Sequence, residues 1–148
     1  MKSLHLAGVD DAPKLLPLVA GFHQEMGFGT SAEHQELAVS PLLEGSPHGA
    51  IWMVGLRRAP VGYVTVTFGW SIEYGGLDAI VDELYIRPAV RGRGMGHDAL
   101  DGIAKALRDA GVRALHLEVR RSDERAQAFY ARARFKPRDD YMFMSRVL

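Results

Sequence analysis

The pattern of apolar and polar residues predicts six β-strands. SLHLA and ALHLEV, residues 3–7 and 114–119, alternate between apolar and polar positions. The other predicted strands are the strand-like, apolar-rich segments GAIWMVGL, VGYVTVTFGW, LDAIVDELYI and YMFMSRVL, which are residues 49–56, 61–70, 77–86 and 141–148. β-Branched and aromatic residues, which fit a pleated and half-buried surface, fill residues 61–70. The turn sequence RRAPVG before this segment predicts that the second and third strands form a hairpin.

Apolar residues at helical spacing predict two helices between the first and second strands. The first follows a cap at Asp10 or Asp11 and buries a stripe of leucine, valine and phenylalanine side chains. The second begins at a capping box, in which Thr30 is followed three residues later by Glu33. It should end before Pro41, because the residue that precedes a proline disfavours the helical conformation.

Two further helices are predicted in the second half of the chain. One runs from about Gly94 to Ala110, and Gly111 stands just past its end. The other follows Ser122 or Asp123, either of which can cap it. The order is strand, two helices, three strands, helix, strand, helix and strand. It predicts an α/β (α+β) fold with a mixed, mostly antiparallel central sheet flanked by helices.

Length and composition restrict the class of protein. With 148 residues, 47% of them hydrophobic and 24% charged, the chain has the size and composition of one soluble globular domain over residues 1–148. No signal peptide or membrane span is read from it, and we expect a cytoplasmic protein. The sequence has no cysteine and no HExxH spacing, so we expect no disulfide, no cysteine nucleophile and no metal site.

The charges are divided unevenly along the chain, although the net charge is zero. Residues 1–86 hold four basic and ten acidic side chains, and residues 87–148 hold fourteen basic and eight acidic ones. Such a division can be an accident of solvated surface, or it can mean that one half binds an anion and the other a cation.

A glycine-rich segment follows the strand over residues 77–86 and opens the next helix. Such a loop brings backbone N–H groups and the positive end of a helix dipole to one point, which suits a phosphate. A flexible, solvated turn is the plain alternative. A dinucleotide fingerprint at Gly94–Ala99, with Glu118 about 20 residues on, competes with these readings. Its first glycine stands too far from the strand, and too few residues follow for a second nucleotide-binding half. A P-loop is excluded because no GxxxxGK[ST] occurs.

The sequence Arg91-Gly92-Arg93-Gly94-Met95-Gly96 resembles the [RQ]xxGx[GA] acyl-CoA signature of the GNAT-superfamily N-acetyltransferases. The later AQAFY, with Phe135 beyond it, is similar to that family's second motif, apart from Asp123 and Arg134, which stand where the family usually has Asn and Gly. The resemblance implies a GNAT-like domain and acetyl-CoA as co-substrate. The residues that it places at the cofactor are Leu84, Tyr85, Ile86, Arg91, Gly92, Arg93, Gly94, Met95, Gly96, His97 and Asp123. The backbone of Leu84 and Ile86 should contact the pantetheine arm, and Gly92 to His97 should contact the pyrophosphate.

Acetyl transfer to an amine needs a base for the ammonium and an acid for the leaving thiolate. Tyr130, the tyrosine of the second motif, is the predicted acid, and packing on an amphipathic helix is its alternative role. Asp82 and Glu83 interrupt an apolar strand and are the candidate bases. Because adjacent strand residues point to opposite faces, we expect at most one of them to face the site, with Glu83 slightly preferred for its reach. An ion pair with an arginine is the other possibility for each.

Several other residues are weaker candidates for the acceptor site. They are the charged or polar His23, Glu25, Glu73 and Asp78, which are expected mainly at the solvated surface, and the aromatic Trp52, Trp70 and Tyr74, which are expected mainly in packing.

The predicted function is acetyl-CoA-dependent N-acetyl transfer to a small, cationic primary amine by direct attack on the thioester. The alternatives are an acyl-CoA-binding sensor without turnover and, from another class, an arginine-rich nucleic-acid-binding module. We expect no nucleic-acid or membrane partner, and a homodimer is possible on the family resemblance.

Overall fold

The computed structural model describes residues 3–148, which divide into two compact units, one ending at Glu118 and one from Val119 to Leu148. In the first unit, η denotes a 3₁₀ turn, and the elements are β1 (Leu4–Leu6), η1 (Val9–Asp11), α1 (Ala12–Met26), α2 (Ala32–Leu43), β2 (Gly49–Leu56), β3 (Ala59–Ser71), β4 (Gly76–Ile86), η2 (Pro88–Val90), α3 (Met95–Asp109) and β5 (Ala114–Leu117). The second unit contains α4 (Glu124–Arg132). One domain over residues 1–148 remains our prediction.

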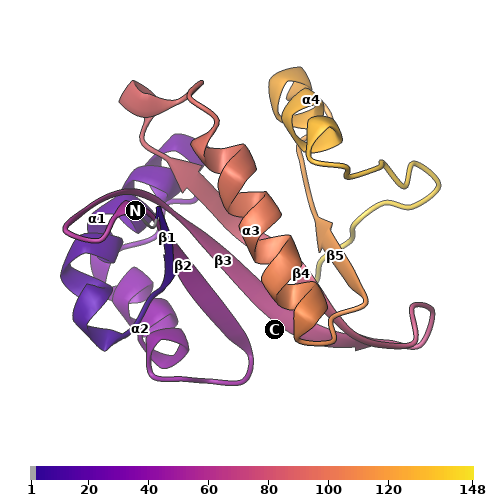
Figure 1. Cartoon of the computed structure of the whole chain (residues 1–148), viewed down its shortest axis with the longest axis horizontal. Helices are drawn as coiled ribbons and strands as arrows, with labels where there is room; N and C mark the ends of the chain where they lie inside the picture. The colour runs from indigo at the N-terminus through magenta and orange to yellow at the C-terminus, as the bar shows by residue number, and fades with distance from the viewer. Residues whose placement is uncertain (1–2) are drawn as a thin grey trace. The chain divides into compact units, whose positions relative to one another are not determined.

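The five strands form one sheet in the order β1-β2-β3-β4-β5 (Figure 1). Neighbouring strands run antiparallel except β4 and β5, which are parallel because α3 carries the chain from one to the other. The hairpin predicted between residues 49–56 and 61–70 is β2–β3. The predicted mixed, mostly antiparallel α/β sheet is therefore confirmed.

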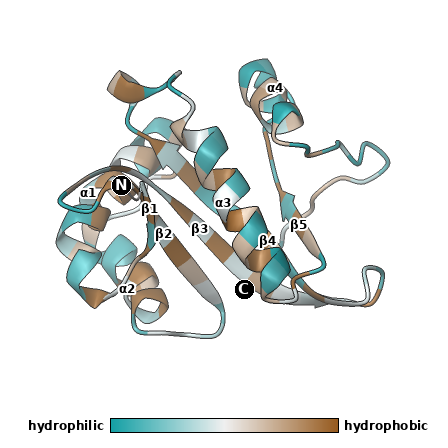
Figure 2. Ribbon diagram, in the orientation of Figure 1, coloured by the Kyte–Doolittle hydropathy of each residue, from teal (hydrophilic) through white to brown (hydrophobic). Residues whose placement is uncertain are grey.

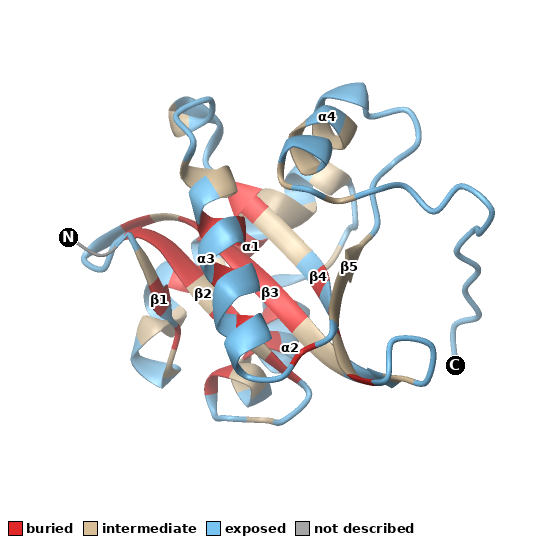
Figure 3. Cartoon of the chain, turned by 45° about the vertical axis from the view of Figure 1, so that its right-hand side comes forward, coloured by how far each residue is buried: buried red, intermediate tan, exposed pale blue. Residues whose placement is uncertain are grey.

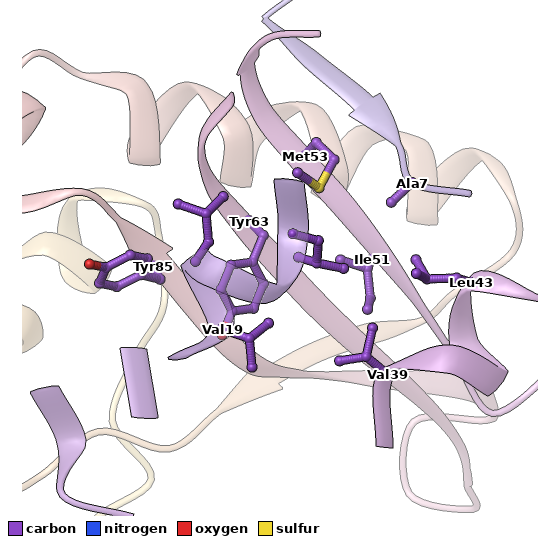
Figure 4. Packing of buried hydrophobic residues seen from close by; sticks show 10 residues of the cluster. Ala7, Val19, Val39, Leu43, Ile51, Met53, Tyr63 and Tyr85 are labelled. Carbon is purple, nitrogen blue, oxygen red and sulfur yellow. The ribbon is translucent and has the colours of Figure 1, made fainter. Parts of the chain in front are cut away.

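Helices cover both faces of this sheet. Helices α1 and α2 pack on one face, where Leu15 and Val19 meet Ile51 and Tyr63 of the strands (Figure 4). Helix α3 lies across the other face (Figure 3) and buries one stripe, Ala99, Leu100, Ile103 and Leu107, while its opposite side stays polar (Figure 2). This stripe is the one that the 3.6-residue periodicity predicts.

The second helix differs from its prediction at both ends. Ser31, not Thr30, is its N-cap, and the Ser31 hydroxyl accepts from the His34 N–H at 3.1 Å. The helix also continues through Pro41 to Leu43. Proline removes one backbone donor, and in the last turn this interrupts a single hydrogen bond near the helix end, so the helix tolerates it.

The second unit keeps the predicted helix but not the predicted final strand. Asp123 caps α4, as its Oδ1 accepts from the Ala126 N–H at 3.0 Å. Arg134, past the helix end, has a left-handed φ of 73°, the conformation that glycine adopts without strain at this place. Residues 141–148 form no strand with any described part of the chain, and their large apolar side chains are exposed. The apolar residues of this segment predict a strand from the sequence, and a sequence pattern does not supply a paired neighbour. Across residues 3–148, no helix is both long and apolar enough to cross a bilayer.

Candidate active site

A β-bulge divides β4 at Asp82. Thr65 of β3 lies opposite Glu83, whereas the next residue, Val66, lies opposite Val81, so Asp82 has no partner residue across the ladder. A bulge breaks the alternation of side chains between the two faces of a sheet. The expectation that at most one of the two carboxylates faces the site is therefore wrong: Asp82 and Glu83 line the same pocket.

This pocket lies between α1, α2 and the sheet and has a volume of about 90 Å³. Its lining combines two carboxylates and two imidazoles with an apolar wall; the lining residues are Val19, His23, His34, Gln35, Ala38, Val39, Leu42, Ile51, Thr65, Asp82 and Glu83. A pocket with these side chains suits the ammonium end of a small molecule, with the carboxylates at the charge and the apolar residues beside the attached carbons.

The Glu83 carboxylate is held by two side chains. Tyr63 donates its hydroxyl to Oε1 at 2.7 Å, and His23 Nε2 lies 2.7 Å from Oε2. The His23 and Glu83 side chains are only 14% and 16% exposed, which strengthens both contacts. Burial, together with the nearby Glu83 charge, raises the pKa of Tyr63 far above its ordinary value of 10.0, so this phenol is a permanent donor.

Asp82 has a different environment. Among residues 3–148, none forms a hydrogen bond or an ion pair with its carboxylate, which lines the pocket although part of the residue is exposed to solvent. Partial desolvation inside the protein raises the pKa of Asp82 above 3.8, and a charge on protonated His23 would oppose that rise. A carboxylate with a raised pKa and no partner can accept a proton more readily than its neighbour, whose two oxygens are occupied.

Beyond the bulge, one edge of β4 is open. Strand β5 pairs only with Asp78 to Val81, so in the described structure residues 82–86 have β3 as their one neighbour. The Arg87 N–H donates to the Val61 carbonyl at 2.8 Å. In an antiparallel ladder, residues that bond to the neighbouring strand alternate with residues that do not, so in β4 Tyr85 bonds to β3 whereas Leu84 and Ile86 do not. The backbone groups of Leu84 and Ile86 consequently point away from β3, toward the open edge.

The glycine loop follows this edge directly. Gly92 and Gly94 both have a φ of 81°, a left-handed conformation, and no atom lies within 4 Å of where a Cβ would stand on either. Gly94 is the N-cap of α3 and supplies no side chain, which leaves the first N–H groups of the helix without an intrahelical partner. The loop has the open space and the donors that an anion requires.

The Arg91 side chain folds back onto the protein. Its Nε donates to the Ile86 carbonyl at 2.7 Å, its Nη2 to Glu25 at 2.8 Å, and its guanidinium lies over the Tyr85 ring. These contacts fasten the glycine loop to the end of α1. The role of Arg91 at the cofactor stays a prediction, as do those of the exposed Arg93 and of His97, which pairs with Asp101 at 3.3 Å.

Tyr130 and Asp123 lie in the second unit. Burial, with the Asp123 charge as a smaller cause, raises the pKa of Tyr130, so the phenol keeps its proton at neutral pH. Asp123 uses one oxygen to cap α4.

The sequence does not point to four polar residues that the structure places at or beside the pocket, and it favours a surface position for a fifth. The four are Tyr63, Thr30, His34 and Gln35, and the fifth is His23. Thr30 lies 2.6 Å from His23 Nδ1, and the Gln35 amide donates to Thr30 at 3.0 Å. No motif marks these residues, because their contacts join segments that are distant in sequence. The remaining weak candidates lie elsewhere: Asp78 contacts His116 at 3.6 Å, and Trp70 is exposed.

The fold is that of an acyl-group transferase, and comparison with known proteins gives the family. The model of the acetyltransferase (GNAT) family matches residues 19–135, so the chain belongs to that family. Among curated proteins, none matches the chain by sequence.

Solved structures agree with this assignment. An integron cassette protein from the mobile metagenome of Cole Harbour Salt Marsh is 34% identical, with a TM-score of 0.86 over 99% of this chain and 90% of its own. A candidate acetyltransferase from Arthrobacter sp. FB24 is 27% identical, with a TM-score of 0.84 over 100% of this chain and 97% of its own. The ribosomal-protein-alanine N-acetyltransferase of Brucella melitensis biovar Abortus 2308, at 19% identity, a TM-score of 0.79 and coverage of 99% and 100%, shares the fold.

Proposed function

We propose that this acetyltransferase transfers the acetyl group of acetyl-CoA to a small, cationic primary amine. The observation that carries the proposal is the bulge at Asp82. At this bulge two carboxylates line one pocket, and the pairing of β4 with β5 ends at Val81, the residue before it, so that no β5 residue covers the backbone of residues 82–86. An amine site and an extended-chain site thus adjoin each other on one strand.

The residues present fit acetyl-CoA. The open edge offers the backbone N–H and C=O of Leu84 and the N–H of Ile86 to an extended amide chain such as pantetheine, while the Ile86 carbonyl already accepts from Arg91 Nε. The N–H groups from Gly92 to His97 would hold the pyrophosphate. When bound there, acetyl-CoA supplies an activated acetyl thioester.

Asp82 is our choice for the base. A lysine-like amine with a pKa near 10.4 is neutral in roughly one molecule in a few thousand at pH 7, so an ammonium must lose a proton before it can attack. Asp82 is free to take that proton at the pocket, whereas Glu83 already accepts from Tyr63 and lies against His23. The sequence preference for Glu83 depended only on the length of its side chain.

Tyr130 is our choice for the acid. Its raised pKa keeps the phenol protonated, which lets it hold the proton that the leaving thiolate needs. The chain has no cysteine for a cysteinyl acyl-enzyme, so direct transfer to the amine is the simpler chemistry.

The charge of the pocket supports a cationic acceptor. Asp82 and Glu83 belong to the acidic part of the chain, residues 1–86, and the glycine loop belongs to the basic part. We expect cationic amines to be preferred over acidic ones, most strongly at low salt.

The test is release of CoA thiol from acetyl-CoA with a panel of cationic, neutral and acidic primary amines. We expect turnover with cationic amines and little with acidic ones. Stabilisation of the protein by CoA with no thiol release for any amine would instead indicate a binding protein without turnover. Equal turnover of acidic and cationic amines at low salt would contradict the preference for a cationic acceptor but not the acetyl transfer itself.

Tyr130→Phe tests the acid. We expect a loss of turnover on the order of 100-fold, with binding of acetyl-CoA retained. Tyr141→Phe, at an exposed tyrosine of the same unit, is the matched control and should turn over like the wild type. Full turnover of Tyr130→Phe would remove Tyr130 from the mechanism.

A further inference from the structure

A chain of hydrogen bonds runs from α2 to β4 through His23. The Gln35 amide donates to the Thr30 hydroxyl at 3.0 Å, Thr30 Oγ1 lies 2.6 Å from His23 Nδ1, and His23 Nε2 lies 2.7 Å from Glu83 Oε2. One placement of hydrogens satisfies every partner: Thr30 donates to Nδ1, and the neutral imidazole donates its Nε2–H to Glu83. We call these residues, together with Tyr63, the His23 network.

The His23 network ends on a carboxylate that has a donor at each oxygen. Tyr63, which is buried at 0% exposure, supplies the second donor. Two donors, one at each oxygen, fix the plane of the carboxyl group. Glu83 is therefore held in one orientation next to Asp82.

The His23 network also joins three elements that line the acceptor pocket. His23 is on α1, Gln35 on α2 and Glu83 on β4, while Thr30 is in the turn between the two helices. The groups that face the His23 ring are Glu83 and Thr30 by hydrogen bond, Phe22 and Phe28 by edge contacts, and Asp82 as the one further carboxylate that would feel a charge on a protonated ring. Any rotation of the ring would break at least one of these contacts.

We propose that His23 is a positioning residue of the acceptor site, which acts through Glu83: it fixes the carboxylate that anchors the acceptor ammonium while Asp82 takes the proton. This role depends on the proposed acetyl transfer to an amine. It requires both ring nitrogens, since one must accept from Thr30 while the other donates to Glu83.

The kinetic test compares two substitutions of His23. In His23→Gln, the amide oxygen can accept from Thr30 and the amide nitrogen can donate to Glu83, because their separation resembles that of the two imidazole nitrogens. His23→Leu removes both bonds. We expect His23→Leu to lower kcat/KM for the amine about 100-fold, as a misplaced reactant does, and His23→Gln to restore most of it, with the KM for acetyl-CoA unchanged in both.

The matched control is the other buried histidine that contacts a carboxylate. His5 is 8% exposed, and its Nε2 lies 3.4 Å from Asp11, away from the pocket. His5→Leu should lower stability and leave kcat/KM close to that of the wild type. An equal kinetic loss in His5→Leu and His23→Leu, or an equal loss in His23→Gln and His23→Leu, would overturn the positioning role.

A second measurement does not depend on turnover. Nitrogen-15 NMR of the substrate-free protein should show His23 as the Nε2–H tautomer with a slowly exchanging proton, and Glu83→Leu, which removes the acceptor oxygen, should abolish that protection. An Nδ1–H tautomer, or protection unchanged in Glu83→Leu, would overturn the proposal. A wild type that acetylates no amine but shows the expected tautomer would refute the proposed function while leaving the His23 network in place.

Discussion

The two halves of β4 differ in the number of strands that pair with them. From Gly76 to Val81 the strand is paired with β3 on one side and, from Asp78, with β5 on the other, and Ala79 and Val81 are buried. From Asp82 to Ile86 it is paired on one side alone, and its carboxylates face a pocket. One extra residue in the ladder separates the two halves. In the proposed function, one strand therefore stabilises the sheet at one end and binds reactants at the other.

The largest expected effect comes from Asp82→Asn. It keeps the size of the bulged residue and removes its ability to take a proton, so we expect kcat to fall by about 100-fold or more. Steady-state kinetics with a cationic amine from the panel provides the measurement. Near-wild-type turnover would show that the bulged carboxylate is not the base.

Gly94→Ala tests whether the glycine loop, which follows the open half of β4, binds an anion. Its left-handed φ of 81° disfavours alanine by about 1–2 kcal/mol, so the loop should shift and misalign its N–H groups. We expect CoA to bind about tenfold more weakly by calorimetry, which corresponds to about 1.4 kcal/mol.

Gly75→Ala is the control for that substitution. Gly75 has a similar φ of 86° and equally open space, but it lies in the turn between β3 and β4. Both variants should lose similar stability, and Gly75→Ala should bind CoA normally. Equal weakening of CoA binding in both would show that general destabilisation is the cause.

Ala79→Gly tests the paired half. Ala79 is fully buried between β3 and β5, and losing its methyl group while gaining backbone freedom should lower the free energy of unfolding by about 1 kcal/mol. Chemical denaturation measures this loss. The paired half supports the sheet and not the proposed reaction, so kcat should stay unchanged. A fall in kcat as large as that of Asp82→Asn would contradict the distinction between the two halves.

The smallest expected effect is a stability gain in Asp82→Asn. Burial raises the pKa of Asp82 above 3.8, so the ionised carboxylate is less stable in the folded protein than in the unfolded chain. This cost is present above the folded-state pKa and vanishes as the pH falls below 3.8. We expect Asp82→Asn to be more stable than the wild type at pH 7, with the difference disappearing on acidification. A less stable variant at pH 7 would contradict this.

Much of the open half could be predicted from the sequence, because local signals specify it. The glycines, the helix start after Gly94 and the strand that ends at Ile86 are each encoded within a few residues. The placement of Asp82 beside Glu83 could not be predicted, since a bulge depends on the register between two strands and not on one of them. The His23 contact to Glu83 spans 60 residues and leaves no local pattern.

Amide hydrogen exchange along β4 tests the division of this strand most directly. The account predicts that the Leu84 and Ile86 amides exchange quickly in the free protein and become protected when acetyl-CoA is added, while the Ala79 amide is slow in both states. Leu84 and Ile86 amides whose exchange is unaffected by acetyl-CoA, in a protein that calorimetry shows to bind it, would contradict the account.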